Sequence, residues 1–191
     1  MKALIILFFS LVTSAQSKAQ NSFPPIYFNG IDTFIIGDHQ SKYYNAILNN
    51  RLTKVQTDTL QKHIVTYYAY NRDSLIPYRI DSIDFRNMIF TFSDSILACV
   101  DLSKMYFTKD YENAVEYVEK KMHFLKSYIS KRHIRKGKAK NFYLTDTYMN
   151  YGYEWIKGDY SIILNMQFDI PKSRTVSLDL YISNKKLNDY F

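Results

Sequence analysis

The stretch YGYEWIKGDYSIILNMQF, from Tyr151 to Phe168, contains the pattern that decides the predicted fold. Apolar and polar side chains alternate on both sides of Lys157-Gly158-Asp159, a combination typical of a turn between two strands. In the second half of the stretch, four large apolar residues share one face: Ile162, Leu164, Met166 and Phe168. The same alternation continues in TVSLDLYIS, residues 175 to 183. The sequence therefore predicts three antiparallel strands, each with one apolar face.

A long helix is predicted before these strands, in DYENAVEYVEKKMHFLKSYISKRH, residues 110 to 133. Apolar residues recur every three or four positions along it: Tyr111, Ala114, Val115, Val118, Met122, Leu125 and Ile129. This spacing is typical of a helix with one buried stripe. Acidic residues lie early and basic residues late, which complements the helix dipole. Gly137 is suited to end the helix.

The first half of the chain shows a similar order of elements. A short helix is predicted at residues 41–48, and residues 77–102 alternate as three strands. Residues 57–70 are ambiguous, because part of the segment keeps helical spacing whereas IVTYYAY is rich in β-formers. We predict a helix there. The fold class that follows is α+β, with helices packed on one face of an antiparallel sheet. Two tandem units of one helix plus three strands, at 26–104 and 105–191, are an alternative reading of this domain.

The N-terminal residues have the order of a secretory signal peptide. Lys2 precedes a short apolar stretch, and two small-x-small sites end at Ala15 and Ala19. About ten apolar residues are too few to span a bilayer as a helix, which needs about 20. We therefore expect residues 1–19 to be a signal peptide cleaved near Ala15 or Ala19, and residues 20–191 to be a single exported domain, periplasmic or secreted. The alternative is that the segment is a buried strand or helix of the domain.

Composition indicates an ordinary globular protein with one unusual segment. Hydrophobic residues make up 47% of the chain, enough for a core, and Cys99 is the only cysteine, so no internal disulfide stabilises an exported domain. Without Lys2 and Lys18, the chain has 23 basic and 18 acidic side chains. Six of those basic side chains lie in KRHIRKGKAK, residues 131 to 140, so the rest of the mature chain has 17 against 18. One segment thus supplies the whole positive excess.

This basic segment has two interpretations. Lys131 and Arg132 belong to the last turn of the predicted helix, where cations are favoured. The rest would be a solvated loop, or a contact to anionic lipid, polysaccharide or nucleic acid. Nucleic acid is the least favoured, because no nucleic-acid fold signature is present. The candidate contact residues are Arg135, Lys136, Lys138 and Lys140.

An aromatic row is the second candidate contact. Tyr151, Tyr153 and Trp155 project from one face of a predicted strand at a spacing of about 7 Å. If exposed, the row would stack on sugar rings or anchor a protein partner. If covered by the long helix, it would be core.

Catalytic and metal-binding motifs are absent from the sequence. It has no Gly-rich phosphate loop, no G-x-S-x-G, no H-E-x-x-H and no paired C-x-x-C. Glu119 and His123 would form only half a metal site. Cys99 lies within a predicted strand, where a buried hydrophobe is a commoner role than a nucleophile. The aspartates at turns or on polar strand faces are expected to be solvated: Asp81, Asp84, Asp94 and Asp101. We predict no catalytic residue, no metal and no cofactor.

The order of elements resembles small exported modules of the BamE-like and β-lactamase-inhibitor-like type. FIIGDHQSKYYNAIL, residues 34 to 48, resembles their strand–Gly–helix entry, and GYEWIKGDYSIILNM followed by TVSLDLYIS resembles their closing strands. The resemblance covers element order only and implies a role in protein–protein contact or assembly.

We therefore predict a non-catalytic protein-binding or envelope-assembly module of a bacterial type, with an envelope or extracellular protein as partner. The alternatives are a hydrolase acting on an extracellular polymer, or a binder of an anionic polymer or membrane through residues 135–140. No transmembrane segment is expected in the mature chain.

Overall fold

The structure, a computed structural model, describes residues 26–31, 33–49, 51–70, 78–80, 83–85, 87–107, 111–133, 137–144, 148–169 and 175–188. The predicted signal peptide lies outside these residues.

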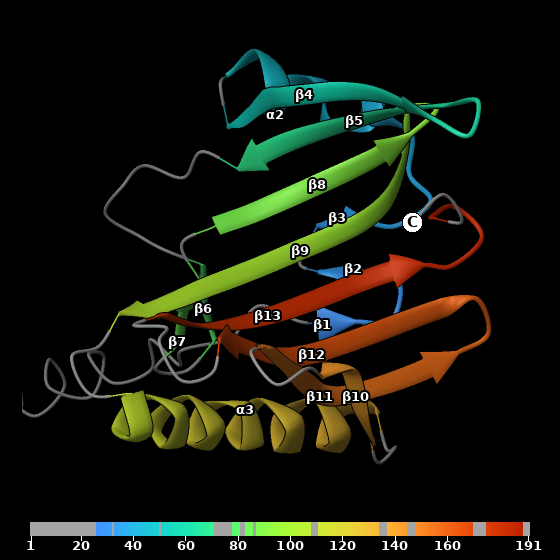
Figure 1. Cartoon of the computed structure of the whole chain (residues 1–191). Helices are drawn as coiled ribbons and strands as arrows, with labels where there is room; N and C mark the ends of the chain where they lie inside the picture. Colours follow the sequence, from blue (N-terminus) through green and yellow to red (C-terminus); the bar gives the residue numbers. More distant parts are fainter. Residues whose placement is uncertain are drawn as a thin grey trace, which may run out of the picture.

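Eight strands form one antiparallel sheet in the spatial order β10-β11-β12-β13-β9-β8-β5-β4 (Figure 1). Their bounds are β4 (Leu52–Leu60), β5 (His63–Tyr70), β8 (Asn87–Ser93), β9 (Ile96–Phe107), β10 (Lys138–Leu144), β11 (Tyr148–Lys157), β12 (Tyr160–Asp169) and β13 (Thr175–Asn184). The order is symmetric, because each half of the chain contributes four strands and the last strand of each half is central. Strands β9 and β13 pair along nine residues, which joins the halves into one sheet.

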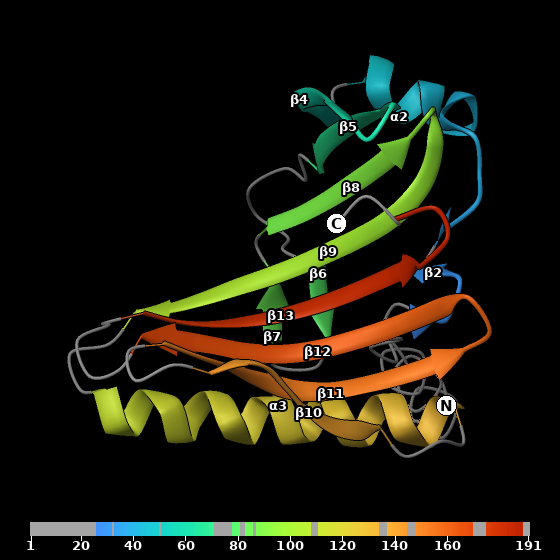
Figure 2. The ribbon, with the colours of Figure 1, turned by 45° about the vertical axis from the view of Figure 1, so that its right-hand side comes forward.

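Smaller elements and one long helix complete the described structure. They are β1 (Ile26–Tyr27), β2 (Gly30–Ile31), β3 (Phe34–Ile35), η1 (Gln40–Tyr43), α2 (Tyr44–Leu48), β6 (Tyr78–Ile80), β7 (Ile83–Phe85) and α3 (Tyr111–His133). The β1–β3 and β6–β7 sheets lie behind the large sheet in the view of Figure 1. Figure 2 shows α3 running along the lower edge, beneath β11 and β12.

The core lies between α3, the small sheets and one face of the large sheet. The apolar stripe of α3 is buried as predicted, through Val118, Met122, Leu125 and Ile129. It packs against β9, β12 and β13. The predicted apolar rows of β12 and β13 are buried on the same side, so the alternation read from the sequence is confirmed for these strands.

Aromatic packing covers the other half of this face. The Phe34 ring of β3 lies 4.2 Å, centroid to centroid, from Phe90 of β8 and also contacts Tyr70 of β5. Tyr43 of η1 packs on Phe92. The helix and the small sheets therefore cover one face of the large sheet. Of the described helices and strands, none lies on the opposite face, which we call the uncovered face.

The predicted α+β fold class is wrong. The molecule is mostly β, with one large antiparallel sheet. The proposed unit of one helix plus three strands is also wrong, because each half gives four strands to a shared sheet. Alternation identified individual strands, but strand pairing between the two halves depends on contacts distant in sequence.

The predicted helix at residues 57–70 is instead part of the β4–β5 hairpin. Its two-residue loop is Gln61-Lys62, and both residues have positive φ, 47° and 78°. Such a turn normally uses Asn and Gly, so the sequence lacks the usual hairpin signal there. The expected strand near residues 78–83 also differs, since β6 pairs with β7 in a separate small sheet and β5 pairs with β8.

Candidate functional site

The aromatic row of β11 lies against α3. Trp155 is 2% exposed and its Nε1 donates to Ser130 Oγ at 3.3 Å. Tyr151 donates its hydroxyl hydrogen to Glu119, and Tyr153 Oη lies 3.5 Å from His123 Nδ1.

The helix therefore occupies the face from which the row was expected to bind. Lys126 Nζ also lies 3.9 Å from the Tyr153 ring centroid, within the range of a cation–π contact. This placement agrees with the alternative in which the long helix covers the row and the row is part of the core. A role for it in ligand contact stays a prediction. Glu119 and His123, considered above as half a metal site, both contact tyrosines of β11.

Gly137 lies against the indole of Trp155. A Cβ at Gly137 would approach Trp155 Cε2 to 2.5 Å, closer than real contacts allow. The glycine is thus required by close packing, and the helix has already ended at His133. The sequence predicts a loop after the helix, but β10 begins at Lys138, directly after Gly137, and forms an edge of the sheet.

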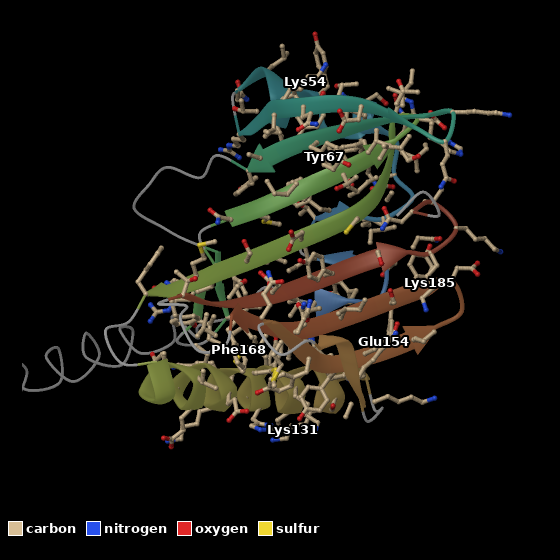
Figure 3. The ribbon with its side chains drawn as sticks, in the orientation of Figure 1. Lys54, Tyr67, Lys131, Glu154, Phe168 and Lys185 are labelled. Carbon is tan, nitrogen blue, oxygen red and sulfur yellow. The ribbon has the colours of Figure 1, made fainter. Side chains whose placement is uncertain are left out.

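The basic candidates are only partly brought together. Lys138 and Lys140 lie on β10 and are exposed, whereas Arg135 and Lys136 fall outside the described residues. Lys140 Nζ is 3.0 Å from Glu154 Oε2, and Lys185 Nζ is 3.4 Å from Glu154 Oε1. Figure 3 shows Glu154 and Lys185 near the ends of β11 and β13. The contact role of these lysines remains a prediction.

Glu154 is kept ionised by these lysines. Burial by itself would raise the pKa of its carboxyl, but the hydrogen bonds and charges of Lys140 and Lys185 outweigh burial and lower the pKa. This ion-paired group forms one end of the uncovered face.

The centre of the uncovered face carries a group of buried polar residues. Strand register places Asn165 of β12 opposite Asp179 of β13, and Asp179 opposite Ser103 of β9. Asn165 and Asp179 are 4% and 2% exposed. In the adjacent row, Asp101 of β9 lies opposite Tyr181. Asp101 and Asp179 are therefore diagonal neighbours on the two central strands.

Hydrogen bonds connect part of this group. Ser177 Oγ donates toward both carboxylate oxygens of Asp179, each at 2.7 Å. Asn165 Nδ2 donates to Asn150 Oδ1 at 2.8 Å. We call Asp101, Asn165, Ser177 and Asp179 the central polar cluster.

Two oxygens of the cluster have no hydrogen-bond partner. Asp101 Oδ1 and Asn165 Oδ1 are both buried and unsatisfied. Leaving a buried acceptor unpaired costs about 1–3 kcal/mol, so such groups are uncommon in native proteins. Their position on one sheet face makes the cluster the strongest candidate site among the described residues.

Both carboxyl groups are electrostatically destabilised when ionised. Burial raises the pKa of Asp101 to about 7, and the charge of Asp179 adds to the effect. Burial likewise raises the pKa of Asp179 to about 6, although the hydrogen bond from Ser177 acts in the opposite direction. The expectation that Asp101 is a solvated carboxylate is therefore wrong, because its Oδ1 is buried and burial raises its pKa.

Cys99 lies on the same face as Asp101, two residues before it, and is buried. Burial, followed by the charge of Asp101, raises the pKa of its thiol far above neutrality. A thiolate nucleophile is thus disfavoured here. Among the described residues, no group of three or more His, Cys, Asp or Glu side chains is arranged to hold a metal ion.

Asp179 and Asn165 were not singled out from the sequence. A signal was present, since Asp and Asn are depleted in strands and both stand in the middle of predicted ones. Their neighbours in sequence are apolar, so the alternation predicts only that Asn165 and Asp179 lie on the polar face of their strands.

Comparisons with protein-family models, curated proteins and solved structures find no significant match to this chain. Within the residues that the structure covers, no helix has the length and apolar character needed to cross a membrane.

Proposed function

We propose that the chain is a non-catalytic binding module that contacts a protein partner through the uncovered face of its large sheet. The observation that carries this proposal is the central polar cluster, with two buried acceptor oxygens left unpaired on the face that no described helix or strand covers. A bound partner would supply the missing donors.

The side chains around the cluster suit a protein interface. Ile89, Ile163 and Tyr181 are partly exposed next to Asp101 in register. Met105, on the same face of β9, is 54% exposed. Aromatic, aliphatic and Met side chains around a few polar groups are typical of interface centres.

Export is part of this proposal. The order of charged, apolar and small residues at the N-terminus supports a signal peptide over residues 1–19, and an envelope or extracellular protein would then be the partner. The mass of the chain recovered from the envelope or medium tests this step. A mature chain beginning after Ala15 or Ala19 is expected, and an intact N-terminus would contradict it.

The binding proposal is tested by blocking the uncovered face. Ile163→Trp adds bulk there without changing charge, and Phe124→Trp places the same residue on the exposed side of α3, where Phe124 is 38% exposed. Immobilised wild-type chain and both variants are incubated with envelope extract. A protein retained by the wild type and the Phe124 variant but lost from the Ile163 variant supports the proposal. Equal retention by all three chains contradicts it.

A hydrolase is the second candidate, favoured by one observation. Two neighbouring carboxyl groups with raised pKa values, about 7 and about 6, resemble the acid and base that hydrolases use. Asp179 is less suited to that role, because it is 2% exposed and already accepts the hydroxyl hydrogen of Ser177. Release of reducing ends from extracellular polysaccharide by the wild type, abolished in Asp101→Asn, would favour this candidate.

A further inference from the structure

The central polar cluster has the chemistry of an acceptor site. Asp101 Oδ1 and Asn165 Oδ1 are buried acceptors without a donor, and they lie on either side of Asp179 across three adjacent strands. A ligand that fits must therefore bring hydrogen-bond donors. Both oxygens have almost no accessible surface, so a small shift of the side chains around them must accompany binding of a donor group.

Charge points to a cation. Two carboxyl groups lie as diagonal neighbours, at a Cα separation of about 7 Å. Among the described residues, no lysine, arginine or histidine forms an ion pair with either of them. Lys140 and Lys185 are already paired with Glu154. A positive group placed between Asp101 and Asp179 would attract both carboxylates and relieve their repulsion.

The neighbouring side chains fit an aliphatic stem. Asp101 lies in register between Tyr181 of β13 and Ile89 of β8, and Ile163 follows Tyr181 in the same row. All three are partly exposed. A lysine buries its methylene groups on apolar surface while its ammonium meets polar partners, which matches this arrangement.

We propose that the central polar cluster binds a primary ammonium group, carried by a lysine side chain of the protein partner. This inference rests on the proposed function and names the chemistry of its contact. The ammonium lies between Asp101 and Asp179 and donates to Asp101 Oδ1, with Asp179 as the second negative charge.

Other donors fit less well. A guanidinium is larger and binds a carboxylate through both oxygens, whereas Asp101 Oδ1 is buried and Asp179 is only 2% exposed. A divalent ion such as calcium takes six to eight oxygen ligands, and one flat sheet face offers few. A neutral sugar supplies donors but does not offset the two carboxylates.

The test uses n-butylammonium as the probe. It is titrated into the purified chain at pH 8 while the methyl resonances of Ile89 and Ile163 are followed by NMR. We expect saturable shifts at both residues. Two matched probes separate the contributions of charge, N–H donors and aliphatic stem to binding. Tetramethylammonium has the charge without N–H donors, and n-butanol has the stem without the charge. Both are expected to bind at least about tenfold more weakly.

Variants locate the binding site. Asp101→Asn and Asp179→Asn each keep the shape of the side chain and remove one charge, and either is expected to weaken butylammonium binding at least about tenfold. Asp58→Asn, on the edge strand β4, is the matched control and is expected to leave binding unchanged. A well-dispersed NMR spectrum of each variant verifies that it is folded. Two variants of the cluster are made, so the test still works if one of them does not fold.

Proton competition gives an independent readout. Because protons and the ammonium compete for the carboxylates, butylammonium binding is expected to weaken about tenfold from pH 8 to pH 5. The other titratable groups on this face include Cys99, Tyr67 and Tyr181. Glu154 lies in the same register row as Asp101, with Lys138, Lys140 and Lys185 around it.

Several results would overturn the proposal. They are absence of butylammonium shifts, equal binding of tetramethylammonium or n-butanol, and tighter binding of Ca²⁺, Mg²⁺ or methyl glucoside at the same resonances. The experiments distinguish failure of the ammonium contact from failure of the proposed function. If Ile163→Trp still abolishes partner retention while butylammonium does not bind, only the ammonium contact is wrong. If butylammonium binds but Ile163→Trp retains the partner, the proposed function is wrong.

Discussion

Asp101 and Asp179 occupy equivalent positions on the two central strands of the sheet. Asp101 pairs with Tyr181, and Asp179 pairs with Ser103, so exchanging β9 and β13 exchanges the two carboxyl groups. The local sequences correspond as well, Cys99-Val-Asp-Leu in β9 and Ser177-Leu-Asp-Leu in β13. As a result, two acids that are far apart in the sequence meet at the centre of the uncovered face.

This pairing predicts an unusual pH dependence of stability. The pKa of Asp101 is about 7 in the folded chain against an ordinary value of 3.8. A raised carboxyl pKa means that the folded chain holds the proton more tightly than the unfolded chain. The contribution of Asp101 to stability is therefore full below about pH 4 and is lost as the pH rises through about 7. Asp179 acts in the same direction.

Asp101→Asn removes the charge and should raise the free energy of unfolding by about 1–3 kcal/mol at pH 8, and by much less at pH 4. Urea unfolding at the two pH values measures the difference, with Asp58→Asn as the charge-matched control. A variant that is less stable than the wild type at pH 8 would show that the Asp101 carboxylate has a stabilising partner.

Gly137→Ala should destabilise the chain. The added Cβ would lie 2.5 Å from the Trp155 ring, which is buried. We expect a loss of about 1–3 kcal/mol in the free energy of unfolding, typical of overpacking. Far-ultraviolet circular dichroism in urea measures it. In a Trp155→Phe background the smaller ring should reduce the cost; an undiminished cost would place its origin in the backbone of Gly137.

Lys62→Gly should stabilise the β4–β5 hairpin. Lys62 has φ 78° in a two-residue loop, a conformation that glycine adopts without strain. The expected gain is about 0.5–1 kcal/mol, measured as a higher urea midpoint with an unchanged m-value. Lys54→Gly, within β4, is the comparison and should lower the midpoint. An equal decrease of the urea midpoint in both variants would argue against backbone strain at Lys62.

Lys140→Ala should raise the pKa of Glu154 toward its ordinary value. Glu154 has a lowered pKa, so its ion pairs stabilise the chain above the ordinary carboxyl pKa of 4.5 and stop doing so as the pH falls through the folded value. Because Lys140 is about half exposed, solvent screens the pair and a loss of about 0.5–1 kcal/mol at neutral pH is expected. Lys138→Ala, the exposed neighbour, is the control. The carboxyl titration by NMR gives both pKa values, and an unchanged pKa would assign the shift to Lys185.

Sequence patterns predicted the elements whose signal is local. The stripe of α3 and the alternation of β12 and β13 each repeat many times, so no distant contact was needed to read them. The turn at Gly158-Asp159 has glycine at a position with positive φ, 61°, as sequence rules for turns expect. These parts are confirmed by the structure.

Other parts depended on contacts that a single sequence does not display. Gln61-Lys62 forms a tight turn without the usual turn residues, so the sequence pattern favours a helix over residues 57–70, which are in fact the end of β4 and all of β5. The basic composition around Lys138 masked the start of β10. The site needed the register of β12, β13 and β9, since only pairing places Asn165 beside Asp179. A polar residue in the middle of a strand was the available signal.

The proposed binding surface is the uncovered face, with Asp101 and Asp179 at its centre. The most direct measurement places a photo-crosslinking amino acid at Ile163 on this face, or at Phe124 on the exposed side of α3, in cells producing the chain. We expect a discrete crosslinked partner from position 163, with less of this product in the Asp101→Asn variant, and no such product from position 124. A partner crosslinked from position 124 but not from position 163 would contradict it.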